Sequence, residues 1–277
     1  MLGSVLDPSM VRRAMLGVER VYHLAGISHL WTPDREDYDR VNHIGTRIVL
    51  SAAAEMRIKR FIHCSSEAVL CANRRDDRYV QSAIGPDDMP GDYTRSKFLG
   101  EQAALTAAQN GLAVTLVSPT ATIGPGDRNA TAPTAMLAMF VRRPPPLVLD
   151  GLMNLVDVRD VAAGILLADS CGRVGERYVL GGENIRICEL LDRLAKLLGR
   201  RRISYPLPGQ VALGFAFIAE WIADHITHRS PIATAEGVRL ALRSTGFDTH
   251  KAASELGYRP RPLTTSLAET VLWLCDH

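Results

Sequence analysis

The 277-residue sequence has few of the features that mark secreted, metal-bound or membrane-spanning proteins. Its five cysteines form no C-x-x-C pair, which argues against disulfide and zinc frameworks and favours a reducing compartment. No basic segment followed by an apolar run opens the chain, so no signal peptide is predicted. The longest apolar run, 211–219, is too short to cross a bilayer. We therefore expect a cytoplasmic protein.

An excess of charge of one sign is also lacking. The chain has 32 basic and 30 acidic residues, a net charge of +2, and the basic residues are scattered. This distribution predicts no nucleic-acid partner. Segment 211–226 is apolar but lacks a basic face, which disfavours a peripheral membrane role. The hydrophobic share of 47% and the charged share of 22% are those of a soluble globular protein.

Strand and helix patterns alternate through the first half of the chain. We predict a strand stub at 2–6, a helix from Asp7 to about 15, and further strands and helices at 18–25, 34–56, 59–65, 92–110 and 113–117. The apolar strand at 18–25 is expected to be covered on both faces. A loop of about two dozen residues follows the strand at 59–65. This alternation predicts an α/β fold with a doubly wound parallel sheet.

The rhythm changes near residue 142, after which short strands and amphipathic helices are predicted. They lie at 155–158, 160–168, 177–180, 189–198, 210–226 and 263–275. We expect residues 1–150 to form the sheet domain. Residues 151–277 return some segments to the sheet and form a smaller, mostly helical cap over its carboxyl edge, where ligands of such sheets bind.

Tyr93 and Lys97 stand four residues apart on one face of the predicted helix at 92–110. Asp92 is its predicted N-cap and Gly111 its stop. An ammonium beside a phenol favours phenolate, so the pair is predicted to lower the pKa of Tyr93 and to transfer protons near neutral pH. The alternative is a solvated surface pair, since the spacing arises by chance in about one such chain in ten.

Further stretches in the same order give the pair its context. The sequence resembles the extended short-chain dehydrogenase/reductases of the NAD-dependent epimerase/dehydratase family, most closely their hopanoid-associated sugar epimerase and dihydroflavonol-reductase-like branch. The stretches that carry the resemblance are HLAG (23–26), LWTPD (30–34), NHIGT (42–46), CSS (64–66), YTRSKFLGEQ (93–102), SPTATIGPGD (118–127), NLVDVRDVAAG (154–164), GERYVLGGEN (175–184) and ELGYRPRPL (255–263).

The resemblance implies a catalytic Ser66, Tyr93 and Lys97. Ser66 would donate a hydrogen bond to the substrate oxygen, Tyr93 would give or take the proton, and Lys97 would hold the phenolate and the nicotinamide ribose. The alternative for Ser66 is a serine that satisfies backbone groups at a strand end. Glu67 stands where a small or apolar residue is expected. It is either a substrate contact or a solvated carboxylate, and we slightly favour the solvated carboxylate.

The same resemblance implies the residues that meet NAD or NADP. They are Val5, Leu24, Ala25, Gly26, Asn42, Tyr93, Lys97, Val117 and Pro119. Asn42 and Pro119 are equally well explained as ordinary helix and loop residues. His23 fits a core histidine better than a ligand, and Trp31 fits a pocket wall or the core. No metal site is predicted.

The family's glycine-rich turn, G-x-x-G-x-x-G, does not occur in the sequence. By the resemblance, the chain starts at the third strand, and Val5 lies in a segment that touches adenine. We therefore expect a Rossmann-like doubly wound sheet lacking its first two strands. The strand at 18–25 would then lose a neighbour and expose apolar faces and unpaired backbone. An N-terminally truncated reading of a complete enzyme explains this, as does a short form that has lost dinucleotide binding.

The functional expectation is a Ser-Tyr-Lys oxidoreductase or epimerase that uses NAD or NADP at a carbinol or carbonyl carbon, and that is inactive in its truncated form. Its substrate is a sugar or a ketone or aldehyde, and the same residues serve epimerisation and net reduction. The alternative is a non-catalytic remnant that binds a partner. A homodimer is compatible with the sequence but not required by it.

Overall fold

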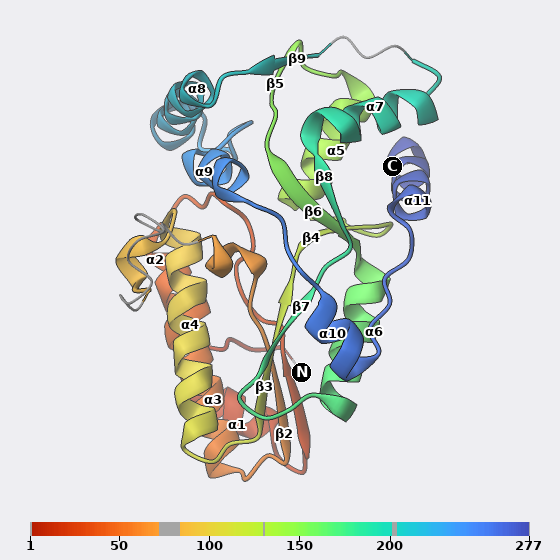
Figure 1. Ribbon diagram of the computed structural model, residues 1–277. Coiled ribbons are helices and arrows are strands. Elements are labelled where there is room, and N and C mark those ends of the chain that lie inside the picture. Colours follow the sequence, from red (N-terminus) through yellow and green to blue (C-terminus); the bar gives the residue numbers. More distant parts are fainter. Residues whose placement is uncertain (1, 72–83, 130, 201–203, 277) are drawn as a thin grey trace.

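A parallel four-stranded sheet forms the centre of the computed structural model, which describes residues 2–71, 84–129, 131–200 and 204–276 (Figure 1). Its strands, in the order in which they pair, are β1 (Arg20–His23), β2 (Arg60–Cys64), β3 (Val114–Pro119) and β7 (Arg177–Leu180). All three pairings are parallel. The predicted α/β class with a parallel sheet is confirmed.

Helices cover both faces of this sheet (Figure 1). One face packs on α1 (Pro8–Ala14), α3 (Thr46–Glu55) and α4 (Asp92–Gln109), and the other on α6 (Val158–Cys171) and α10 (His250–Leu256). Both faces need cover because successive side chains of a strand point to opposite faces of the sheet. Phe61 of β2 lies in the core on the first face, and its neighbour Ile62 lies in the core on the second. The predicted doubly wound, Rossmann-like arrangement is confirmed.

The carboxyl ends of these strands lead into a second group of elements, drawn at the top of Figure 1. A three-stranded sheet joins β4 (Ala121–Ile123), β6 (Leu152–Asp157) and β8 (Glu183–Arg186), and β5 (Leu147–Leu149) pairs with β9 (Tyr205–Leu207). Around them lie α5 (Ala132–Arg142), α7 (Ile187–Leu197), α8 (Gly209–Ile222), α9 (Ala235–Arg243) and α11 (Leu263–Asp276). The division of the chain at residue 150 stays a prediction.

The helix predicted at 34–56 is continuous but not uniform. It begins as α2 (Glu36–Tyr38), passes through the π-helical η1 (Asp39–Gly45) and continues as α3. Shorter turns are η2 (Glu67–Leu70), η3 (Pro86–Asp88) and η4 (Ala223–Thr227). Much of the predicted long loop, 72–83, lies outside the described residues.

The strand predicted at 2–6 is wrong. These residues form a turn, in which the amide of Leu6 donates to Ser4 Oγ at 3.1 Å and that of Asp7 donates to the Ser4 carbonyl at 3.2 Å. Asp7 then caps α1, as predicted, by accepting from the Ser9 amide at 2.9 Å. A serine side chain that binds the backbone and an immediate helix start leave no extended segment between them.

The full cover that the apolar composition of 18–25 predicts is not observed, whereas the exposure expected from the absence of a neighbouring strand is observed. Within the described residues β1 pairs with β2 alone and lies at the end of the sheet order. Tyr22 is 38% exposed and Arg20 is exposed, whereas His23 is buried. An apolar run shows that a strand can be covered, but cover depends on neighbours that the run does not specify.

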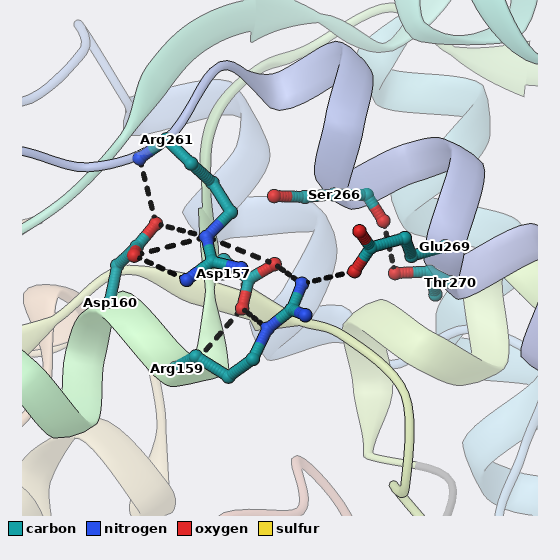
Figure 2. A network of polar contacts seen from close by, with 7 residues as sticks. All are labelled: Asp157, Arg159, Asp160, Arg261, Ser266, Glu269 and Thr270. Carbon is teal, nitrogen blue, oxygen red and sulfur yellow. Dashed lines mark hydrogen bonds and ion pairs between the residues drawn. The ribbon is translucent and has the colours of Figure 1, made fainter.

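Charged residues fasten the last helix to the rest of the molecule (Figure 2). Asp157 has a fully buried side chain that accepts from Arg159 Nε at 2.8 Å and Nη2 at 2.7 Å, and Asp160 accepts from the Arg261 amide at 2.8 Å. Burial opposes the charge of Asp157, but the hydrogen bonds from Arg159 outweigh it and lower the pKa to about 2. The network joins the β6–α6 junction to the segment before α11.

No helix in the described ranges is long and apolar enough to span a membrane.

Candidate active site

Tyr93 and Lys97 lie in the first two turns of α4, which the sequence predicted. The helix ends at the predicted stop, where Gly111 has a φ of +96° that favours glycine. The predicted N-cap is wrong, because Gly91 occupies that position and Asp92 is the first helical residue. Tyr93 is only 7% exposed, so the pair does not form part of a solvated helix surface.

Ser66 reaches the same place from the end of β2. It is 8% exposed and caps η2, where its Oγ accepts from the Ala68 amide at 3.2 Å. Ser66 also lies close enough to Tyr93 to lower the pKa of the phenol. Lys97 Nζ donates to the Cys64 carbonyl at 2.8 Å, which ties α4 to the last residue of β2. The carboxyl end of β2 and the start of α4 therefore bring Ser66, Tyr93 and Lys97 together.

Glu67 belongs to this group, although the sequence favoured a solvated carboxylate. Its Oε2 accepts from Ser66 Oγ at 2.9 Å. Burial raises its pKa to about 7, against the opposing effect of the Ser66 hydrogen bond and the charge of Lys97. A carboxyl that titrates near neutrality thus lies one hydrogen bond from the serine. Its position directly after Ser66 was the signal that sequence reasoning underweighted.

The predicted lowering of the Tyr93 pKa is wrong for this arrangement. Burial raises that pKa above its ordinary value, and the carboxylates of Glu67 and Glu236 raise it further. Lys97 is itself largely removed from water, which lowers its own pKa. Desolvation disfavours both charged forms, so at neutral pH the site holds Tyr93 as a phenol.

The residues expected to approach the cofactor lie beside this cluster at the end of β1. Leu24 is 56% exposed, and Ala25 and Gly26 are exposed. A Cβ added to Gly26 would lie 2.9 Å from Asn42 Oδ1 and 3.8 Å from Lys97 Nζ. The backbone at Gly26 therefore passes directly by Lys97, and glycine permits this close approach.

Asn42, from the π-helical segment, is a buried clamp in this structure. Its Oδ1 accepts from the Ile27 amide at 2.7 Å, and its Nδ2 donates to the Ile27 carbonyl and to Ser96 Oγ, both at 3.0 Å. Asn42 thereby fixes the segment after Gly26 against α4. Its polar groups have these internal partners, which favours a supporting role.

The remaining expected contacts lie on β3 and in the turn before α1. Val117 is buried in the core between β3 and α6, and Pro119 ends β3 in register with Leu180. Val5 packs on the α1–α3–α4 core, where its Cγ2 would lie 2.8 Å from a Cβ on Gly45. The structure does not bring Val5 together with the group around Tyr93.

Two residues that the sequence left open now have partners. His23 is buried, with Nε2 2.9 Å from Thr46 Oγ1, and burial followed by the charge of Lys97 lowers its pKa to about 4. Trp31 is buried and its Nε1 donates to Asp224 Oδ1 at 2.7 Å. In the described ranges, no cluster of three or more histidine, cysteine or acidic side chains could hold a metal ion.

The residues present fit one half of a dinucleotide. The partly buried Lys97, the phenol of Tyr93 and the exposed segment 24–26 after β1 suit the nicotinamide ring of the cofactor and the ribose attached to it. The pyrophosphate half requires backbone amides of a glycine-rich turn, and no G-x-x-G-x-x-G occurs in the sequence.

Known proteins share both the sequence and the fold. Residues 2–181 match the NAD dependent epimerase/dehydratase family. A Synechocystis sp. protein provisionally named a dihydroflavonol 4-reductase is 34% identical over 98% of this chain and 80% of its own. Sterol demethylase protein B of Methylococcus capsulatus is 29% identical over 98% and 83%.

Among solved structures, that of gox2253 has a TM-score of 0.83 and 30% identity, covering 99% of this chain and 84% of its own. UDP-glucuronic acid 4-epimerase from Bacillus cereus, solved with UDP-glucuronic acid and NAD, has a TM-score of 0.73 over 99% and 80%; its 19% identity supports the fold alone. With the family match covering most of the sequence, this chain belongs to the NAD-dependent epimerase/dehydratase family.

Proposed function

We propose that the chain provides the acid–base groups of an NAD- or NADP-dependent reaction at a carbinol or carbonyl carbon, with Tyr93 as the proton donor or acceptor. The observation that supports this best is the meeting of β2 and α4, where Ser66 lies close enough to the Tyr93 phenol to lower its pKa and Lys97 is fixed on the Cys64 carbonyl. These three groups match the family's Ser-Tyr-Lys set in type and order.

Each residue has a distinct task in this proposal. Tyr93, held as a phenol, gives its proton to the substrate oxygen during reduction and recovers it in the reverse direction. The nicotinamide, when bound, supplies or removes the hydride. Lys97 and the segment 24–26 are the residues that would hold its ribose end, and the ammonium of Lys97 stabilises negative charge on the phenol as its proton leaves.

Ser66 has one hydroxyl hydrogen, so its availability depends on Glu67. When Glu67 is ionised, it accepts that hydrogen at 2.9 Å. When Glu67 is protonated, Ser66 is free to donate to the substrate oxygen. Because the pKa of Glu67 is about 7, the two states are close in free energy at neutral pH. This coupling favours a pH-dependent reaction.

The substrate class we propose is a sugar or a ketone or aldehyde. Relatives include one provisionally named a dihydroflavonol 4-reductase and one named a dTDP-glucose 4,6-dehydratase. Reduction and epimerisation both need one proton donor and one hydride partner at the same carbon, so the proposed residues serve either reaction. The proposed reaction does not require a homodimer, and the fold is compatible with one.

The test combines cofactor binding with turnover. Thermal unfolding is followed with NAD and NADP for two forms of the protein: the 277-residue chain, and the same chain with a glycine-rich dinucleotide-binding strand–turn–helix unit fused at its start. Cofactor at 100 times its Kd adds about 2.7 kcal/mol of stability. We expect little protection of the unfused chain and clear protection of the fused form, as the missing turn predicts.

The form that binds cofactor is then assayed with sugar nucleotides and with ketones, with Tyr93→Phe as the key variant. We expect this variant to lose turnover and to retain cofactor binding. Full turnover by Tyr93→Phe would refute the assignment. Absence of binding and turnover in every form would favour the alternative of a non-catalytic, partner-binding protein.

A further inference from the structure

The helix that carries Tyr93 lacks an N-cap side chain of its own. Its N-cap residue is Gly91, and the first amides of a helix have no acceptor within that helix. Glu236 of α9 fills this role from a distant part of the chain. Its Oε1 accepts from the Thr94 amide at 2.7 Å, its Oε2 accepts from the Tyr93 amide at 3.3 Å, and Thr94 Oγ1 also donates to it.

The carboxylate is held deep in the protein. Glu236 is only 5% exposed, and burial raises its pKa while the hydrogen bonds from Thr94 and Tyr93 lower it. A negative charge at the N-terminus of α4 is favoured by the helix dipole as well as by these amides. The buried charge is therefore matched by α4 itself.

Gly91 makes room for this contact. A Cβ at this position would lie 2.5 Å from the carboxyl carbon of Glu236 and from its Oε2. Its φ of −171° is extended backbone that any residue adopts, so space, not conformation, accounts for the glycine. One turn after Glu236, Arg239 Nη1 donates to the Pro90 carbonyl at 3.0 Å. Helix α9 thus binds residues 90–94 through the side chains of Glu236 and Arg239.

From these contacts we propose that Glu236 is a positioning residue for Tyr93: from α9 it fixes the first turn of α4 and sets the electrostatic surroundings of the phenol. The inference rests on the proposed function only in treating Tyr93 as the acid–base group. The charge of Glu236 adds to that of Glu67 in raising the pKa of Tyr93, whereas the nearby Ser66 hydroxyl lowers it. The same residue that orders the helix therefore also favours the phenol over the phenolate.

Amide hydrogen exchange and a tyrosine titration test the proposal without requiring turnover. Glu236→Ala removes the acceptor, Glu236→Gln keeps one carbonyl oxygen without the charge, and Gly91→Ala displaces the carboxylate while leaving it in the chain. Glu189→Gln is the matched control, since Glu189 lies in the first turn of α7 and is exposed. Tyr93 is followed by ¹³C-tyrosine NMR, with Tyr93→Phe identifying its signal.

We expect exchange at the Tyr93 and Thr94 amides to rise about tenfold in Glu236→Ala and in Gly91→Ala, with the second half of α4 unchanged. Glu236→Gln is expected to lower the pKa of Tyr93, and Glu189→Gln to change neither quantity. If Glu236→Ala does not fold, the other two variants decide.

Unchanged exchange in Gly91→Ala, or an unchanged Tyr93 pKa in Glu236→Gln, would overturn the proposal. Faster exchange with an unaltered Tyr93 pKa would also overturn it, because Glu236 would then stabilise the helix without acting on the phenol. Failure of the proposed function is a separate result, since it requires turnover by Tyr93→Phe and leaves the exchange data as they are.

Discussion

Replacing Glu67 by glutamine should change how stability depends on pH. In the folded protein the carboxyl has a pKa of about 7, compared with an ordinary value of 4.5, because it is partly removed from water beside Ser66. Glutamine has nearly the same shape, accepts from Ser66 through its amide oxygen and does not ionise. The variant therefore removes the titration and retains most of the packing.

The direction of the pH dependence follows from whether the folded or the unfolded state keeps the Glu67 proton. Between pH 4.5 and 7 the folded protein keeps the Glu67 proton and the unfolded chain loses it, so the free energy of unfolding falls as pH rises through this range. The loss of folding stability from the raised pKa of Glu67 is absent below pH 4.5 and complete above pH 7. A rise of this size in the pKa corresponds to about 3 kcal/mol at full ionisation.

Urea unfolding of the two proteins, measured from pH 4.5 to pH 8.5, checks this reasoning. The Glu67→Gln variant is expected to be more stable than the parent by about 3 kcal/mol at pH 8 relative to their difference at pH 4.5. Exposed Glu189→Gln controls for the loss of a carboxylate and should show no such trend. A difference between Glu67→Gln and the parent that stays constant across this range would refute the assignment of a raised pKa to Glu67.

Further variants test the proposed roles in a form that binds cofactor. Tyr93→Phe should abolish turnover and leave thermal protection by cofactor nearly intact, whereas Lys97→Ala should reduce both, as steady-state assays and thermal unfolding would reveal. Ser66→Ala should lower kcat by about 10²–10³-fold, because it removes one hydrogen-bond donor to the developing charge. Asp157→Asn should cost about 2 kcal/mol at pH 7, measured by urea unfolding, since it weakens the pair with Arg159. The folded-state pKa of Asp157 is about 2, below its ordinary 3.8, so this cost should shrink as the pH falls from 4 towards 2.

Local sequence signals predicted the elements that build the site. The apolar strand at 59–65, the helix from Asp92 and its stop at Gly111 all follow from neighbours a few residues away, and the structure has each of them. The expected meeting of Ser66 with Tyr93 came from the family resemblance, and it fits a parallel strand that ends beside the following helix. The strand and helix signals are local, which is why the topology of the sheet could be predicted.

Predictions that depended on surroundings were less successful. The spacing of Tyr93 and Lys97 is that of helical neighbours, yet burial governs the pKa of both groups and reverses the expected direction for the phenol. The strand at 18–25 has the composition of a covered strand, but its exposure depends on what lies beside it. Burial is a property of the assembled fold, and no short window of sequence contains it.

The two carboxylates near Tyr93 show where this limit lies. Glu67 follows Ser66 directly in the chain, so its presence in the site could be suspected from the sequence, although its near-neutral pKa could not. Glu236 is 143 residues from Tyr93 in the sequence, and the sequence of α9 does not indicate that the Glu236 side chain contacts the start of α4. Both charges raise the pKa of the same phenol from different directions. The protonation state of the proposed catalytic residue is therefore decided jointly by a neighbour in sequence and by a distant helix, and its chemistry cannot be assigned from the Tyr-x-x-x-Lys spacing alone.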